Sequence, residues 1–131
     1  MIEQTALIVS KWQYNPRVVS IDDAGEKLTS SISFDVMKKR AASKKGIACR
    51  FTVKFFFENE MILEYAGENS YVIDLQDMID LNELHTMIRN SYSLFNEKFE
   101  IRKLTTVLRN KSLLTVDVAA YDLEPVLQLL K

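Results

Sequence analysis

The spacing of the apolar residues changes once along this chain, from every second position before residue 74 to every third or fourth position after residue 80. A period of two is typical of a strand with one buried face, whereas spacings of three and four are typical of an amphipathic helix. The clearest alternating set is Ile47, Cys49, Phe51, Val53, Phe55 and Phe57. Because the strands precede the helices instead of alternating with them, the pattern predicts an α+β domain.

Three further segments have the composition of strands, and they cover residues 6–14, 32–36 and 61–73. Asn15 and Pro16 bend or end the first of these, and we expect a bulge or bend at 66–69 within the last. Short connections, such as a turn at 58–60, favour antiparallel neighbours. We therefore expect a four-stranded antiparallel sheet, followed by a long helix and a short C-terminal helix.

The long helix is predicted from apolar residues that share one helical face. These residues are Leu81, Leu84, Ile88, Tyr92, Phe95 and Phe99. Asp80 is placed to cap this helix, and Glu83 is placed three residues later to complete a capping box.

Beyond this face the apolar stripe resumes out of phase, at Ile101, Leu104 and Leu108. We therefore expect either a rotated face or a kink near residues 97–100. A helix that continued from residue 80 to residue 109 would be about 45 Å long, at roughly 1.5 Å per residue. Because that exceeds what the sheet can cover, we expect the surplus apolar face to contact a partner subunit.

A short helix is predicted near the end of the sequence, where Asp122 is a suitable N-cap and Pro125 falls in the first turn. Tyr121 and Val126 stand at the two positions of a hydrophobic staple. The apolar face of this helix comprises Leu123, Val126, Leu127 and Leu130.

The chain has 131 residues, which suits a single domain spanning residues 1–131. Its net charge of −1 creates no global attraction to nucleic acid or to a membrane. No apolar stretch has the length needed to cross a bilayer, and the first residues do not have the pattern of a secretion signal. The single cysteine excludes an internal disulfide. We therefore expect a cytoplasmic protein.

Catalysis requires titratable groups gathered in a cleft, and the sequence shows no such set. The single histidine, His85, lies within the helical repeat, without a second histidine to build a metal site. Cys49 lies on the apolar face of a strand, where a buried structural thiol is favoured over a nucleophile. The three glycines stand alone, so the sequence has no phosphate-binding loop. We expect neither an enzyme nor a bound cofactor or metal.

Six basic residues cluster between Lys38 and Arg50. They could neutralise several phosphates, so nucleic-acid binding through this cluster is one hypothesis. Aromatic residues are not interleaved with these charges, as they would be in a stacking platform for bases. Lysines at strand ends also keep sheet edges soluble. We favour a solvated loop.

The order of these elements and several short strings resemble the SecB family of export chaperones. Residues 63–67, Leu-Glu-Tyr-Ala-Gly, followed by Tyr71, are similar to the family's acidic, glycine-containing fourth strand. Residues 90–95, Asn-Ser-Tyr-Ser-Leu-Phe, stand where the family has a proline-containing signature on its long helix. Residues 114–122 and the closing leucines resemble the family's last strand-like segment and final helix. The resemblance covers nearly the whole chain.

The sequence departs from the family at three points. Ser91 and Asn96 stand in the places of the two signature prolines. The chain ends at Lys131, directly after the last predicted helix, so we expect it to lack the family's tail for docking on the export motor. Its net charge is near zero, whereas export chaperones of the family are strongly acidic. In these respects the chain looks closer to SecB-like chaperones that hold an antitoxin in toxin–antitoxin systems.

The resemblance implies a holdase that uses no nucleotide and binds unfolded or aggregation-prone segments of an antitoxin or a pre-secretory protein. Binding would come from buried apolar area, with sheet-edge hydrogen bonds as a supplement. The residues we expect to line the client groove are Trp12, Tyr14, Val18, Val19, Ile21, Ile32, Phe34, Leu123, Val126 and Leu130. The long helix and the first strand would supply the contacts of a homodimer or homotetramer.

Two alternatives remain open from the sequence. An oligomeric adaptor or assembly protein with this fold would bind one specific folded partner and would not protect unfolded chains. A nucleic-acid binder would act through the cluster between Lys38 and Arg50, and its affinity would fall steeply with salt.

Overall fold

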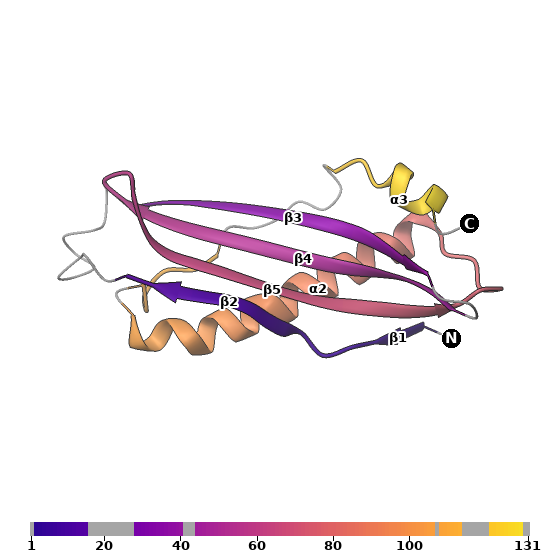
Figure 1. The fold of residues 1–131 in the computed structure, drawn as a ribbon, viewed down its shortest axis with the longest axis horizontal. Coiled ribbons are helices and arrows are strands. Elements are labelled where there is room, and N and C mark those ends of the chain that lie inside the picture. The colour runs from indigo at the N-terminus through magenta and orange to yellow at the C-terminus, as the bar shows by residue number, and fades with distance from the viewer. Residues whose placement is uncertain (1, 16–27, 41–43, 107, 114–120, 130–131) are drawn as a thin grey trace.

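The computed structural model describes residues 2–15, 28–40, 44–106, 108–113 and 121–129. An antiparallel sheet forms one layer, and a long helix lies obliquely across it (Figure 1). The elements are β1 (Ile2–Gln4), β2 (Ile8–Tyr14), β3 (Leu28–Arg40), β4 (Lys44–Phe57), β5 (Glu60–Asp74), α2 (Leu81–Arg102), the 3₁₀ turn η2 (Lys103–Thr105) and α3 (Glu124–Leu129). None of the described helices is both long and apolar enough to cross a membrane.

The sheet has five strands, not the four predicted. β5 pairs with β4 on one side, and on its other side it pairs first with β2 and then with β1, so two short strands share one edge. At the junction between them, the Thr5 N–H donates to the Ser70 carbonyl at 2.8 Å, and the side chain of Leu7 is buried. The predicted strand at 6–14 corresponds to β2, whereas the additional strand, β1, lies before the residues for which a strand was predicted.

The bulge predicted within β5 at 66–69 is not formed there, because the pairing of β5 with β4 is regular across these residues. The nearby shift in register lies instead in β2, between Val9 and Lys11. Gly67 has no positive φ angle, and it is needed for a different reason. A Cβ atom at this position would lie 3.0 Å from Leu7 Cδ2 and 3.2 Å from Phe95 Cδ1. Close packing, and not a bend, therefore selects glycine.

The turn predicted at 58–60 is confirmed as a tight hairpin between β4 and β5. Glu58 and Asn59 have φ angles of 50° and 69°, the left-handed pair that matches the twist of a two-residue hairpin. An irregularity beside the hairpin leaves Ile62 without a register partner in β4 and buries it with Leu63.

α2 packs its predicted apolar face against the sheet, and aromatic rings form the centre of the contact. The Tyr65 ring stacks on Phe95 with centroids 4.1 Å apart, and Phe55 stacks on Phe99 at 5.8 Å. The cap at Asp80 is confirmed, because its Oδ1 accepts a 2.8 Å hydrogen bond from the Glu83 N–H.

The helix is shorter than the longest possibility that the sequence allowed. α2 has 22 residues, about 33 Å at 1.5 Å per residue, and it runs through 97–100 before ending at Arg102. Ile101 and Leu104 are therefore 69% and 64% exposed, whereas Leu108 is fully buried after the chain has turned. The apolar residues that fall out of phase in the sequence, from Ile101 to Leu108, therefore mark the end of α2.

Candidate functional site

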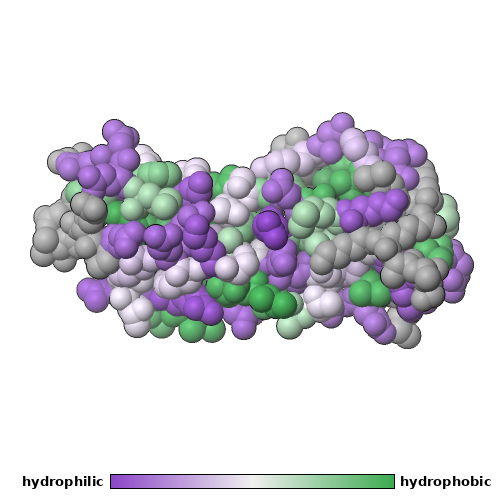
Figure 2. Space-filling model, viewed as in Figure 1, coloured by the Kyte–Doolittle hydropathy of each residue, from purple (hydrophilic) through white to green (hydrophobic). Residues whose placement is uncertain are grey.

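The two faces of the sheet differ in chemistry. The face under α2 carries the aromatic core, whereas the opposite face carries ion pairs, including Lys11 with Glu64 at 2.8 Å and Arg50 with Glu68 at 3.2 Å. In Figure 2, exposed hydrophobic residues form several separate patches among hydrophilic ones. The outline in this view is also hollowed along the edge formed by β3, to one side of α3.

β3 presents three apolar side chains on the face that α2 covers. Ile32, Phe34 and Val36, which we call the β3 strip, lie directly opposite Val53, Phe51 and Cys49 of β4. All three are only half-buried, because β3 pairs with β4 alone among the described strands and α2 lies over the middle of the sheet. The strip therefore combines apolar side chains with a strand edge that no other described strand pairs with.

The segment leading into α3 covers the middle residue of this strip, Phe34. The Tyr121 ring lies against Phe34 with centroids 4.1 Å apart, yet the residue is 42% exposed. Leu123 is buried in the core, and Val126 is half-buried against it. The predicted N-cap is present in part, because Asp122 Oδ1 accepts a hydrogen bond from the Glu124 N–H at 3.2 Å.

Four of the predicted groove residues thus lie on the β3 side of the molecule: Ile32, Phe34, Leu123 and Val126. Val18, Val19, Ile21 and Leu130 lie outside the described residues. Sequence reasoning left out two members of the same surface. Val36 follows Ile32 and Phe34 at a spacing of two, so the alternation already places it on the same face of the strand. Tyr121 was interpreted only as one residue of a hydrophobic staple, and its contact with Phe34 was not predicted.

Trp12 and Tyr14 lie on β2, at the opposite edge of the sheet. One cross-strand row runs from Trp12 through Tyr65 and Val53 to Ile32, which places its ends three strand spacings, roughly 14 Å, apart. α2 lies over the middle of this row, where Phe95 stacks on Tyr65. The structure therefore does not bring the described β2 residues together with the β3 strip.

The thiol and phenol groups of the core are held in their neutral forms. Burial raises the pKa of the Cys49 thiol to about 11, and it raises the pKa of Tyr92 to about 12. His85 is half-buried on α2, and the described residues contain no group of three side chains that could hold a metal ion. The core thus offers packing and no activated nucleophile.

The described part of the basic cluster is largely engaged with neighbouring groups. Lys44 forms an ion pair with Asp74, and its hydrogen bond to that carboxylate raises the pKa of Lys44. Lys45 is buried, and its Nζ donates to the Asp77 carbonyl at 2.7 Å. With Arg50 paired to Glu68, these three cations do not form a continuous basic surface.

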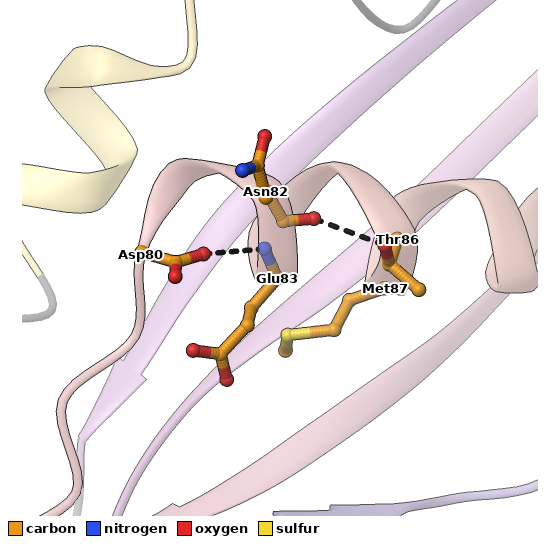
Figure 3. Close-up of a pocket in the computed structure, with 5 residues that line it drawn as sticks. All are labelled: Asp80, Asn82, Glu83, Thr86 and Met87. Atoms are coloured by element: carbon orange, nitrogen blue, oxygen red, sulfur yellow. Dashed lines mark hydrogen bonds between the residues drawn. The ribbon is translucent and has the colours of Figure 1, made fainter.

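A pocket of about 360 Å³ lies at the start of α2 (Figure 3). It is lined by Asp80, Asn82, Glu83, Thr86 and Met87. Its polar groups serve the helix, since the Asp80 carboxylate caps the first turn and the Thr86 hydroxyl donates to the Asn82 carbonyl at 3.0 Å. None of the predicted groove residues lines this pocket.

No protein-family description and no curated protein matches this sequence. Among solved structures, the fold is similar to the Mycobacterium tuberculosis SecB-like chaperone Rv1957, in complex with a ChAD peptide from the Rv1956 HigA1 antitoxin. The identity is 12% and the TM-score 0.54, over 88% of this chain and 90% of that one. A Streptococcus agalactiae protein of unknown function matches with 10% identity and a TM-score of 0.49, over 89% and 97%. The chain therefore has a SecB-like α+β fold.

Proposed function

We propose that this protein is a nucleotide-independent chaperone that holds unfolded or aggregation-prone polypeptide segments. The observation that carries the proposal is the β3 strip, whose three apolar side chains are partly exposed beside a strand edge that no other described strand pairs with. The SecB-like fold supports it, because a chaperone with this fold has been solved with a bound antitoxin peptide. The proposed activity uses no catalytic group and takes place in the cytoplasm.

A client segment would gain affinity at the β3 strip from two sources. Completing the burial of a partly exposed aliphatic or aromatic side chain contributes up to about 1 kcal/mol, and the strip has three such side chains. An extended client can also hydrogen-bond to the outer edge of β3. Backbone bonds tolerate varied sequences, so this combination suits a chaperone better than a site for one small molecule.

We propose that the client is an antitoxin or a pre-secretory protein, with the antitoxin favoured. Support for the antitoxin comes from the peptide bound by Rv1957 and from the near-neutral charge of this chain. Binding should be compared between peptides from antitoxin C-terminal segments and peptides from secretory precursors. Tighter binding of the precursor peptides would reverse the preference.

We propose that the protein forms a homodimer or homotetramer through the β2 edge and the end of α2. Ile101 and Leu104 are exposed there, and Arg102 between them contacts the Trp12 ring at 5.7 Å. Light scattering should show an oligomer that Ile101→Glu with Leu104→Glu dissociates. Met78→Glu, at a residue 73% exposed before the other end of α2, is the control and should leave the oligomer intact.

The test of the holdase is size-exclusion chromatography with light scattering, using reduced carboxymethyl α-lactalbumin as a permanently unfolded client. We expect co-elution with the wild-type protein and its loss in Ile32→Thr with Val36→Thr, which keeps β-branched residues in β3. Met37→Thr, at a residue 38% exposed on the opposite face of β3, is the matched control and should still retain the client.

If the wild-type protein ignores unfolded chains, the holdase proposal fails. Capture of one folded partner through the same strip would then identify an adaptor. Nucleic-acid binding is less well supported, because Lys44 and Arg50 are paired with carboxylates.

A further inference from the structure

A row of aromatic rings runs from the core to the surface beside α3. Tyr92 of α2 lies 5.3 Å from Phe51, Phe51 lies 5.8 Å from Phe34, and Phe34 lies 4.1 Å from Tyr121. The last ring in the row, Tyr121, is 42% exposed. The outermost ring therefore covers Phe34 without being enclosed itself.

Tyr121 can leave this position without undoing the packing of α3. The helix begins at Glu124, and the buried side chains that anchor this segment are Leu123 and Leu127, which are 5% and 7% exposed. Tyr121 precedes the first anchor by two residues. A change of its side-chain rotamer would uncover Phe34 while both leucines stayed buried.

We propose that the Tyr121 ring is an internal occupant of a client subsite, and that an aromatic side chain of the bound segment takes its place on Phe34. The proposal rests on the proposed function and specifies which client side chain the β3 strip selects. Exchange of one ring for another preserves the contact with Phe34, so displacement of Tyr121 requires little net free energy. The remaining client contacts along the strip then decide the affinity.

Displacement of Tyr121 lowers the affinity of every client by the same amount, so the contact with Phe34 itself sets the selectivity. An aromatic client side chain restores the ring contact that Tyr121 gives up, whereas an aliphatic side chain restores only part of it. Segments with an aromatic residue are therefore favoured over segments in which leucine stands at the same position.

The test uses Tyr121→Ala, with Tyr121→Phe as the control that keeps the ring, and N-acetyl-tryptophanamide as the probe. Binding is measured by NMR from the backbone amides of the β3 strip. We expect Tyr121→Ala to bind the probe roughly two- to tenfold more tightly than the wild type, the range that one aromatic pair is worth. Tyr121→Phe should behave as the wild type. Unchanged or weaker binding to Tyr121→Ala would overturn the proposal.

A measurement on the wild-type protein covers the case in which Tyr121→Ala does not fold. Saturation with the probe should move the Tyr121 ring protons toward their unfolded-chain shifts, because they lose the ring current of Phe34. Tyr121 ring shifts that stay constant while the β3 amides respond would contradict displacement. Failure of the holdase itself gives a different result, namely no binding of unfolded α-lactalbumin whatever the probe does.

Discussion

The Nζ atom of Lys103 lies 2.7 Å from the carbonyl oxygen of Lys111, and the Lys103 side chain is only 8% exposed. The same ammonium group contacts Glu100 Oε2 at 2.6 Å and the face of the Phe99 ring at 5.9 Å. A buried cation thus joins the last turn of α2 to the chain that returns beneath it. Lys45 joins β4 to the segment before α2 in a similar way, because its Nζ atom donates a hydrogen bond to the Asp77 carbonyl.

Lys103→Met should lower the free energy of unfolding by about 1–3 kcal/mol, because the Lys111 carbonyl and the Glu100 carboxylate lose their shared donor. Lys98→Met, at an exposed residue on the same helix, is the control and should change it by less than about 0.5 kcal/mol. Urea denaturation followed by circular dichroism measures both. Equal effects of the two substitutions would show that the buried contact contributes nothing specific.

Two glycines of the sheet should differ in their tolerance of alanine. A Cβ atom at Gly46 would lie 2.2 Å from the backbone oxygen of Tyr71, so the paired strands β4 and β5 would have to separate. At Gly67 the nearest atom, at 3.0 Å, belongs to the Leu7 side chain, which can move. We expect Gly46→Ala to destabilise by about 3 kcal/mol and Gly67→Ala by about 1 kcal/mol. Thermal melts compare the two, and the reverse order would contradict this account.

Asn69→Leu should stabilise the protein by about 1–3 kcal/mol. Asn69 is 2% exposed under α2, and within the described part of the chain neither atom of its amide has a hydrogen-bond partner. Leucine has a similar shape and removes both unpaired groups. Asn90→Leu, at an exposed residue of α2, is the control and should be close to neutral. A destabilised Asn69→Leu in chemical denaturation would show that the amide has a partner in solution.

The Cys49 thiol should make stability depend on pH in the alkaline range. Burial raises its pKa from 9.0 to about 11, so the folded state favours the protonated thiol. The resulting stabilisation is fully present below pH 9 and is lost as pH rises toward 11, at about 1.4 kcal/mol per pKa unit. Tyrosines also titrate there, so the measurement is the difference between the wild type and Cys49→Ala. A constant difference from pH 8 to pH 11 would contradict the raised pKa.

The sequence predicts most of the elements because their signals are local. The alternation in β4 and the helical spacing from Leu81 to Phe99 each decide one buried face, and Asp80 caps α2 through its own neighbouring backbone. The hairpin at Glu58 and Asn59 is likewise determined by adjacent residues.

The errors come from contacts between distant segments. β1 was not predicted, because it has only three residues and forms through pairing with residues 71–73 of β5, about seventy positions further along the chain. The predicted groove residues divide between two edges because β5 and β4 lie between β2 and β3, an order that no local pattern records. Tyr121 contacts Phe34 for the same reason. Strand order and loop path are set by tertiary packing, so a single sequence does not reveal them.

α2 lies between the two edges of the sheet at which we propose subunit contacts and client binding. The helix separates the β2 margin of the sheet from the β3 margin, and the stacked rings of Tyr65 and Phe95 fill the space between them. A subunit attached at one margin therefore leaves the other sterically untouched. If the protein assembles and binds clients as we propose, the two events would therefore be independent, and each added subunit would contribute one more binding site.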